Sequence, residues 1–340
     1  LAAAPDAPEA LRATAQTTAG VLAHAQDDLP AAESALDAAL AYWRAAAAPD
    51  RHQFATALRN LANIRYWQTA NAEAARLWQE ALALEEADGN LPAVASLTYN
   101  LGIVNKQMRR VDVARAYLER AIALQRQVGN TLSVINCLNG LSNLVFDEGR
   151  FDECRALLEE ARALALAIDN RAALSFTLCN LADGYLATGE LATARAHLEQ
   201  ALALAREGGF SRNDAYAEAG LAILDLLEGR GAAAWPALED ALATAERIHM
   251  DLMMDYPLYG VALLLALAGR GAAAVALAAF VDGRHYSAQR SPHFQTLYDR
   301  LAAALDLDEA TWAAAEARGR ALSLAEALAL ARAEGQAVAG

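Results

Sequence analysis

The chain has 340 residues and a formal net charge of −14, and 56% of its residues are hydrophobic. Alanine, leucine, glutamate, aspartate and arginine dominate, and no stretch alternates polar residues with β-branched apolar ones as a strand would. The composition therefore predicts an all-α protein. Its negative charge repels phosphate backbones, which argues against direct binding of nucleic acid by this segment.

No segment predicts export or a membrane span. The N-terminus lacks the charged and apolar regions of a signal peptide, and the most apolar run, residues 258–269, is too short to cross a bilayer. The cysteines at 137, 154 and 179 form no CxxC pair, which fits reduced thiols in the cytoplasm. Because the sequence does not begin with Met, we expect a fragment of a longer cytoplasmic protein with no membrane contact.

A period of 40 residues runs along most of the chain. An early copy contains Gly20, Ala32, Leu36 and Ala39 and fits after a shift of two residues. Small residues then recur at Ala74, Ala114, Cys154, Ala194, Ala234 and Ala274. Large apolar residues follow them by four positions, at Trp78, Leu118, Leu158, Leu198 and Leu238. Such regular spacing predicts a repeat architecture.

Each period predicts a hairpin of two helices. In one copy, the first helix covers about residues 91–107 and the second about 111–128. Glycines lie in the breaks, where a left-handed residue ends a helix, at Gly149, Gly189, Gly229 and Gly269. Pro236 falls within a predicted second helix and is expected to kink it. One hairpin cannot bury its apolar face alone, so we expect about seven units over residues 10–283 to stack.

Two copies carry a recognisable pattern of a Leu, a Gly or Ala, and then Ala, a large apolar residue and Ala in the second helix. The residues are Leu101, Gly102, Ala114, Leu118 and Ala121, and Leu181, Ala182, Tyr185, Ala194, Leu198 and Ala201. This pattern resembles the tetratricopeptide repeat, although that repeat has about 34 residues. The resemblance implies an α-solenoid, a right-handed superhelix of about seven 40-residue hairpins over residues 1–283, followed by a C-terminal helical cap over residues 284–340.

The sequence of residues 284–340 predicts three helices. A helix is expected from about Pro292, with Ser291 at its N-cap position. Gly319 is expected to end a second helix, and Ser323 to begin a third, with a glutamate three residues on that completes a capping box.

The run WAAAEARGRALSLAEALALA in the cap resembles the ending of large ATP-binding LuxR-type activators and of activators with a bacterial transcriptional activator domain. This resemblance implies that the chain is the C-terminal sensor portion of a bacterial transcriptional regulator. The ATPase and DNA-binding regions would then lie in the missing part of the parent chain.

No motif with catalytic or cofactor chemistry occurs. The sequence has no GxxxxGK[ST] phosphate loop, no GxSxG, no HExxH and no EF-hand loop. The histidines are scattered, and the two imidazoles of His285 and His293 are not enough to form a metal site. We therefore expect a non-enzymatic protein with no catalytic residue, no cofactor and no metal.

Recognition is instead expected on the first helices, which line the concave groove of tetratricopeptide arrays. At the groove positions the sequence holds amides, aromatic rings and charged groups. These candidates are Arg59, Asn60, Asn63, Tyr66, Tyr99, Asn100, Lys106, Asn136, Asn139, Asn143, Phe146, Asn180 and Asp183. Amides both donate and accept hydrogen bonds, which suits an extended peptide, and aromatic rings add apolar contact.

Two interpretations stay open for Asn60, Asn100 and Asn180, each of which precedes a packing leucine. They resemble the asparagine ladder of peptide-binding tetratricopeptide proteins, or they bond to the neighbouring repeat and fix its geometry. Gly140 and Gly220 interrupt the ladder, which favours a short peptide over a long one.

The other candidates differ in their expected direction. Asn63, Asn139 and Asn143 are predicted to point outward into the groove. Tyr256 and Tyr259 are predicted to pack against the cap and not against a ligand.

The predicted function is a sensor domain that binds a peptide, a protein segment or a small effector in the groove. At the groove positions, Arg59 and Lys106 are either solvated cations or anchors for a carboxylate of the ligand. The alternative is a structural scaffold that associates with itself as a homo-oligomer and assembles a signalling complex.

Overall fold

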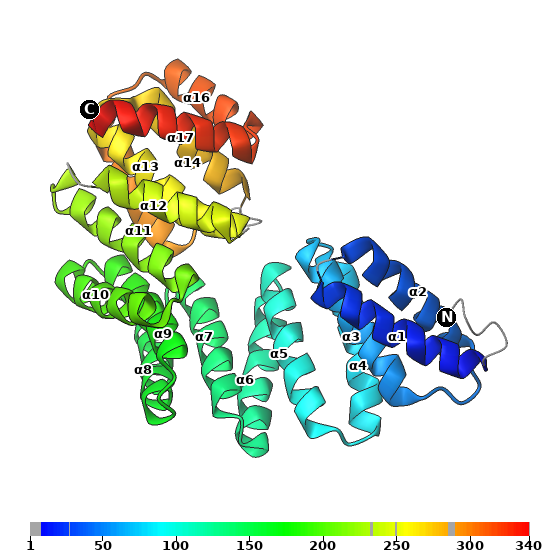
Figure 1. Cartoon of the computed structure of the whole chain (residues 1–340). Coiled ribbons are helices and arrows are strands. Elements are labelled where there is room, and N and C mark those ends of the chain that lie inside the picture. The colour runs from blue at the N-terminus through cyan, green and yellow to red at the C-terminus, as the bar shows by residue number, and fades with distance from the viewer. Residues whose placement is uncertain (1–7, 27, 232–233, 249, 285–289, 340) are drawn as a thin grey trace. The chain divides into compact units, whose positions relative to one another are not determined.

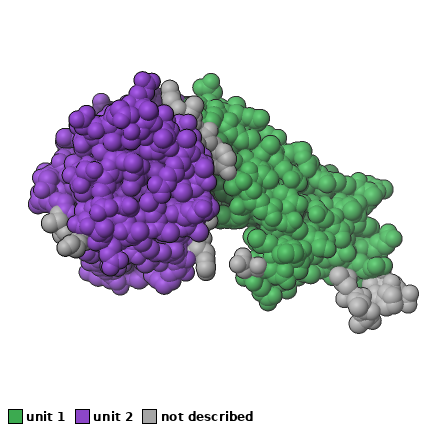
Figure 2. Space-filling view, turned by 90° about the horizontal axis from the view of Figure 1, so that it is seen from above, with its two compact units in different colours: residues 1–144 green, residues 145–340 purple. Residues whose placement is uncertain are grey.

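The structure is a computed structural model that describes residues 8–26, 28–231, 234–248, 250–284 and 290–339. These residues form 17 α-helices and one 3-10 helix, and they contain no strand (Figure 1). The chain divides into two compact units, residues 1–144 and 145–340, which are coloured separately in Figure 2. Each unit is described by itself.

The first unit is built from helical hairpins. Its helices are α1 (Glu9–Ala25), α2 (Leu29–Ala45), α3 (Arg51–Trp67), α4 (Asn71–Ala87), α5 (Leu91–Gln107), α6 (Val111–Val128) and most of α7 (Thr131–Asp147). α1 pairs with α2, α3 with α4 and α5 with α6, and α2 and α4 also pack against the first helix of the next hairpin. The bounds of α5 and α6 confirm those predicted from the 40-residue period.

The second unit continues the same hairpins and adds the cap. Its helices are α8 (Phe151–Ala167), α9 (Arg171–Ala187), α10 (Leu191–Gly208), α11 (Ser211–Leu227), α12 (Ala234–Arg247), the 3-10 helix η2 (Asp251–Met254), α13 (Asp255–Leu267), α14 (Gly271–Arg284), α15 (Pro292–Ala303), α16 (Glu309–Ala321) and α17 (Leu324–Ala339). α9 pairs with α10, α11 with α12 and α13 with α14, whereas α16 packs on α14. The predicted boundary between array and cap at residues 283 and 284 stays a prediction.

The core repeats with the sequence period. The small residues at Ala74, Ala114, Cys154, Ala194, Ala234 and Ala274 are all buried. The large residues that follow them by four are buried as well, at Trp78, Leu118, Leu158, Leu198 and Leu238. Small side chains let neighbouring helices approach, and the large ones fill the space one turn further on. The repeat in sequence is thus a repeat in packing.

The turn inside each hairpin also repeats. Its left-handed residue is Gly149, Gly189, Gly229 or Gly269, with φ between 74° and 81°, as predicted. Thr69 and Arg109 occupy the same register in the earlier repeats, with φ of 61° and 60°. A side chain at such a φ is strained. The turn nevertheless keeps the same backbone conformation in the two repeats that lack the glycine.

Two predictions about single residues are wrong. Pro236 does not kink α12, because that helix begins at Ala234 and the proline lies in its first turn, where no intrahelical donor is lost. Gly319 does not end α16, which continues to Ala321. A Cβ on Gly319 would lie 2.1 Å from the backbone oxygen of Ala276, so this glycine instead allows α16 to approach α14.

The remaining cap predictions hold with one difference. Ser323 Oγ accepts a hydrogen bond from the backbone nitrogen of Glu326, and the Glu326 carboxylate accepts one from the backbone nitrogen of Ser323 at 2.8 Å, which completes the capping box. Ser291 precedes α15 as expected, but its hydroxyl lies 3.3 Å from Nδ1 of His293 and makes no capping hydrogen bond.

Candidate functional site

The first helices of unit 1 carry nine of the candidate residues at positions that solvent reaches. We call these nine residues the amide stripe. They are Arg59, Asn60, Asn63 and Tyr66 on α3, Tyr99, Asn100 and Lys106 on α5, and Asn136 and Asn143 on α7. Asn136 is exposed and the other eight are half-buried. The amide stripe therefore combines amides, phenols and cations on successive first helices.

The ladder position faces the preceding hairpin where glycine occupies it. A Cβ on Gly140 would lie 3.2 Å from Ile103 Cδ1 and 3.3 Å from Tyr99 Cε2, and a Cβ on Gly220 would lie 2.8 Å from Leu198 Cδ1. The side chain of Asn60 donates to the backbone oxygen of its own helix at Thr56, at 2.8 Å. The Asn60 amide is thus bonded within its own helix, and crowding by the preceding hairpin accounts for glycine at 140 and 220. The two interpretations of Asn60, Asn100 and Asn180 stay predictions.

Asn63 and Tyr66 contact the partner helix of their own hairpin. The indole nitrogen of Trp78 donates to Oδ1 of Asn63 at 3.2 Å, and the rings of Tyr66 and Trp78 have centroids 5.6 Å apart. The prediction that Asn63 points outward into the groove is therefore wrong for its Oδ1 atom, because the buried indole of Trp78 needs an acceptor. Both residues stay half-buried and thus remain accessible in part.

Asn139 does not belong to the accessible surface. Its side chain is only 2% exposed, and it donates to the backbone oxygen of Ile135 at 2.9 Å. The predicted outward direction is wrong for this residue, because its amide is bonded within the core one turn back along α7.

In unit 2 the cap contacts the candidate Phe146 and the two tyrosines of α13. Phe146 is buried, and its ring centroid lies 5.6 Å from that of Phe151 and 5.7 Å from that of His293. Phe294, also on α15, lies 6.2 Å from Tyr256 and 5.0 Å from Tyr259 between ring centroids. The prediction that these two tyrosines pack against the cap is confirmed.

Sequence reasoning predicted that the cap packs on the two tyrosines, but it did not anticipate that α15 also covers Phe146. α15 packs against both α9 and α13, and it buries Phe294, Leu297 and Leu301. The spacing of these three residues, at i, i+3 and i+7, indicated an amphipathic helix, but it carried no sign of the surface that the helix would cover.

Asp183, on α9, accepts a hydrogen bond in this region and has a raised pKa. The hydroxyl of Tyr216 donates to Oδ2 of Asp183 at 2.6 Å, and the ring of Tyr216 stacks on that of Tyr256 with centroids 4.7 Å apart. Burial raises the pKa of the Asp183 carboxyl to about 7, and the hydrogen bond from Tyr216 offsets only part of this effect. Asn180, one turn before, is half-buried.

We expect the stability of the protein to depend on pH through Asp183. The pKa of this carboxyl is raised from 3.8 to about 7, so the folded state keeps a proton that the unfolded state has lost, and stability falls as pH rises from about 4 to about 7. Asp183→Asn should therefore raise the melting temperature relative to wild type by a few degrees at about pH 8, and by less at about pH 5. Thermal unfolding at a series of pH values checks this.

The groups that interact electrostatically with Asp183 in this experiment are the Tyr216 and Tyr256 phenols and the Cys154 and Cys179 thiols. Asp306→Asn, at an exposed carboxylate between α15 and α16, controls for the loss of one negative charge. A difference between Asp183→Asn and wild type that stays constant with pH would contradict the prediction.

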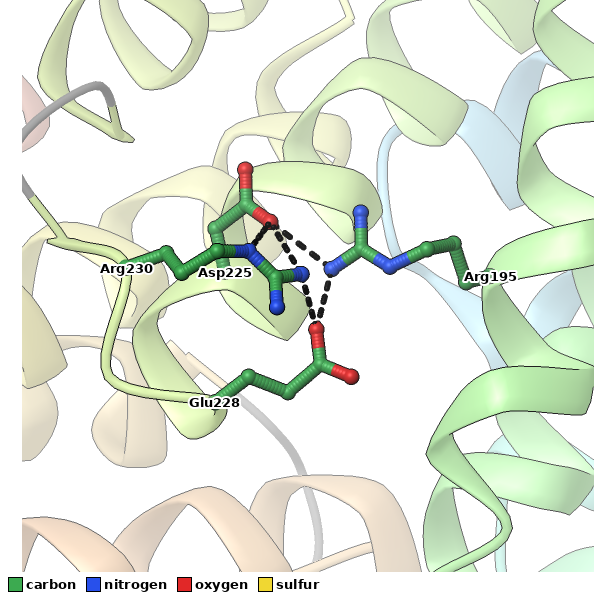
Figure 3. A network of polar contacts seen from close by, with 4 residues as sticks. All are labelled: Arg195, Asp225, Glu228 and Arg230. Atoms are coloured by element: carbon green, nitrogen blue, oxygen red, sulfur yellow. Dashed lines mark hydrogen bonds and ion pairs between the residues drawn. The ribbon is translucent and has the colours of Figure 1, made fainter.

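A second polar cluster joins two neighbouring hairpins of unit 2 (Figure 3). Nη2 of Arg195, on α10, lies 2.7 Å from Oδ1 of Asp225 and 2.5 Å from Oε2 of Glu228, and Arg230 contacts the same two carboxylates. Hydrogen bonds from the arginines lower the pKa of Glu228. The charges of two guanidinium groups and two carboxylates cancel, so the cluster fits a structural link between repeats better than a ligand site.

The described residues provide little for catalysis. Burial raises the pKa of Cys137 and of Cys154 to about 12, so neither thiol is a ready nucleophile at neutral pH. No group of three His, Cys, Asp or Glu side chains in the described part of the chain is placed to hold a metal ion. His285 lies outside the described residues. Nor does any described helix combine the length and apolar character that a bilayer crossing requires.

Comparison with known proteins identifies the repeat. The tetratricopeptide repeat family model matches residues 53–127 and 133–207. No curated protein sequence matches the chain. A signal-transduction ATPase with numerous domains and a tetratricopeptide repeat sensor, from Pyrococcus horikoshii, is similar in structure at 14% identity and a TM-score of 0.59. The match covers 74% of this chain and 40% of that one.

Two further solved structures are complexes with peptides. NprR with its cognate peptide NprX is 14% identical, with a TM-score of 0.57 and coverage of 73% of each chain. The Rap conjugation gene regulator of plasmid pLS20, with the Phr* peptide, is 14% identical, with a TM-score of 0.55 and coverage of 82% of this chain and 84% of that one. At these identities the likeness establishes the fold. The chain is thus an α-solenoid of helical hairpins, and its residues 53–127 and 133–207 are tetratricopeptide repeats.

Proposed function

We propose that the chain is a non-catalytic recognition domain that binds a peptide or protein segment on the amide stripe. The observation that carries this proposal is the row of accessible amides, phenols and cations on α3, α5 and α7. A surface built only for packing would present apolar side chains to the next helix, whereas this row keeps polar groups in reach of solvent.

The side chains of the amide stripe suit an extended peptide. The amides of Asn100 and Asn143 offer both a donor and an acceptor to a peptide backbone. Tyr66 and Tyr99 add apolar contact at a low cost in conformational entropy. Arg59 and Lys106 add positive charge, which suits a carboxylate of the ligand, on a chain whose net charge is −14.

We further propose that recognition serves the regulation of transcription in the bacterial cytoplasm. The similar folds of a peptide-bound conjugation gene regulator and of an ATPase with a repeat sensor support this assignment. In this proposal the peptide or a small effector is the signal, and ATPase and DNA-binding regions elsewhere in the parent protein respond to it.

The test begins with selection of binders to the wild-type chain from a random peptide library. We expect Asn100→Ala with Asn143→Ala to weaken the selected peptides about tenfold to a hundredfold, because each lost amide removes about 1 kcal/mol of hydrogen bonding. Binding is measured by fluorescence anisotropy, and the melting temperature by circular dichroism. The melting temperature should change little, since both side chains are half-buried.

The matched control is Gln127→Ala with Gln200→Ala, which removes two exposed amides from the second helices α6 and α10. This control should bind the selected peptides as wild type does. A large fall in melting temperature with intact binding in the Asn100→Ala, Asn143→Ala variant would make these amides structural and would sink the proposal.

A further inference from the structure

The helix α15 bridges two first helices of unit 2. It packs against α9 and against α13, which belong to different hairpins, and α11 lies between them in the array because it packs against both. Three groove positions of this unit contact it: His293 contacts Tyr256 on α13 and Phe146 at the end of α7, and Phe294 contacts Tyr259 on α13. We call this covered surface the α9–α13 face.

The occupant is a short amphipathic helix. Phe294, Leu297 and Leu301 are buried, and Phe294 contacts Tyr256 and Tyr259, while Arg300 and Gln295 on the same helix are exposed. An isolated helix of this length is unstable in water, so α15 owes its structure to this contact. The α9–α13 face thus already binds one helix, of known sequence and spacing, within its own chain.

The fit between α15 and the α9–α13 face leaves a polar group unsatisfied. The Tyr256 hydroxyl is buried and has no hydrogen-bond partner among the described residues. A buried donor without an acceptor costs free energy that a better-matched occupant would recover. The hydroxyl of Tyr216, whose ring stacks on that of Tyr256, donates to Asp183 and is not hydrogen-bonded to the Tyr256 hydroxyl.

An ion pair between Arg290 and Asp282 joins the start of α15 to α14. Arg290 donates to both carboxylate oxygens of Asp282, on α14, at 2.6 to 3.1 Å, and its guanidinium carbon lies 3.4 Å from the ring centroid of Tyr298. Because α15 belongs to the same chain as the α9–α13 face, it competes for that face at a high effective concentration.

We propose that the α9–α13 face is a docking site for an amphipathic helix of a partner protein, and that α15 occupies it until that partner arrives. The partner helix carries an aromatic residue and two leucines at the spacing of Phe294, Leu297 and Leu301, and a polar side chain that accepts from Tyr256. This site is separate from the amide stripe of unit 1, so it does not depend on the function proposed there.

The probe is a fluorescent peptide with the sequence of residues 290–304, added to the full chain. Wild type binds it weakly, because α15 already occupies the face. Leu297→Ala with Leu301→Ala weakens the internal helix and raises the affinity for the peptide at least tenfold, by the factor that the open state gains in population. Fluorescence anisotropy measures the affinity.

Two controls accompany this experiment. Leu132→Ala with Leu166→Ala truncates two exposed leucines outside α15 and leaves the affinity at the wild-type value. A peptide in which the residues equivalent to Phe294 and Leu297 are alanine fails to bind either variant. A folded Leu297→Ala, Leu301→Ala chain that gains no affinity overturns the proposal.

Hydrogen exchange on the wild-type chain gives a test that needs no variant. The amides of α15 should exchange at least tenfold faster than those of α9 and α13, because α15 opens without unfolding the hairpins. Equal protection of α15 and α13 would make α15 part of one cooperative core and overturn the proposal. A dimer that forms only with intact α15 would also overturn it, since α15 would then belong to the second copy.

Discussion

Gly319→Ala is expected to lower the free energy of unfolding by about 3 kcal/mol, at the upper end of the usual cost of overpacking. The added methyl carbon would lie 2.1 Å from the backbone oxygen of Ala276 and 2.8 Å from its carbonyl carbon. Backbone atoms inside α14 cannot rotate away as a side chain would, so α16 must move as a whole. Urea denaturation followed by circular dichroism measures the loss.

Gly283→Ala is the matched control for this prediction. Gly283 lies in α14, and a Cβ there would meet no atom within 4 Å. The same chemical change should therefore be neutral or stabilising by up to about 1 kcal/mol, because alanine favours the helix. Equal stability of the two variants would mean that α16 does not pack on α14 as closely as described.

Leu118→Ala is expected to lower the free energy of unfolding by about 3 kcal/mol, within the range for a leucine lost from a packed core. Leu118 has no exposed surface, and it follows the buried small residue of its repeat, Ala114, by four positions. Its Cγ is 2.7 Å from where a Cβ on Gly102 would be placed. Gly102→Ala alone should therefore cost about 1 to 3 kcal/mol through the clash.

Combining these two changes distinguishes a packing contact from two independent defects. The double variant should be more stable than the sum of the two losses predicts, by about 1 kcal/mol or more, because the alanine at 102 enters the space that Leu118 leaves. Leu166→Ala, at an exposed leucine of α8, should change stability by about 0.5 kcal/mol or less. Strict additivity of Leu118→Ala and Gly102→Ala would contradict the contact.

The architecture of the hairpins was predictable because the same short-range contacts recur along the chain. The residues that pack between helices repeat at a fixed spacing, so the bounds of α5 and α6 could be read from the period alone. Gly319 was misread because a glycine that ends a helix and a glycine that admits a neighbour look the same in sequence. Only the position of Ala276, more than forty residues earlier, separates the two.

The direction of single side chains in the candidate site was less predictable. Asn63 and Asn139 share the amide chemistry of Asn136 and Asn143, but one accepts from Trp78 and the other bonds to its own helix in the core. The direction in which each amide points depends on which neighbouring polar group lacks a hydrogen-bond partner. The cover of α15 over the α9–α13 face is a contact between distant segments, and periodicity carries no information about it.

The left-handed turn inside each hairpin has a consequence for how such a chain can be rearranged. Because residues 69, 109, 149, 189, 229 and 269 share one backbone conformation at one register, a segment cut between any two of these turns has matching ends. Such a block can be removed, doubled or moved without designing a new junction. The number of hairpins, and with it the length of the surface they offer, can thus change by whole units while each remaining unit keeps its neighbours.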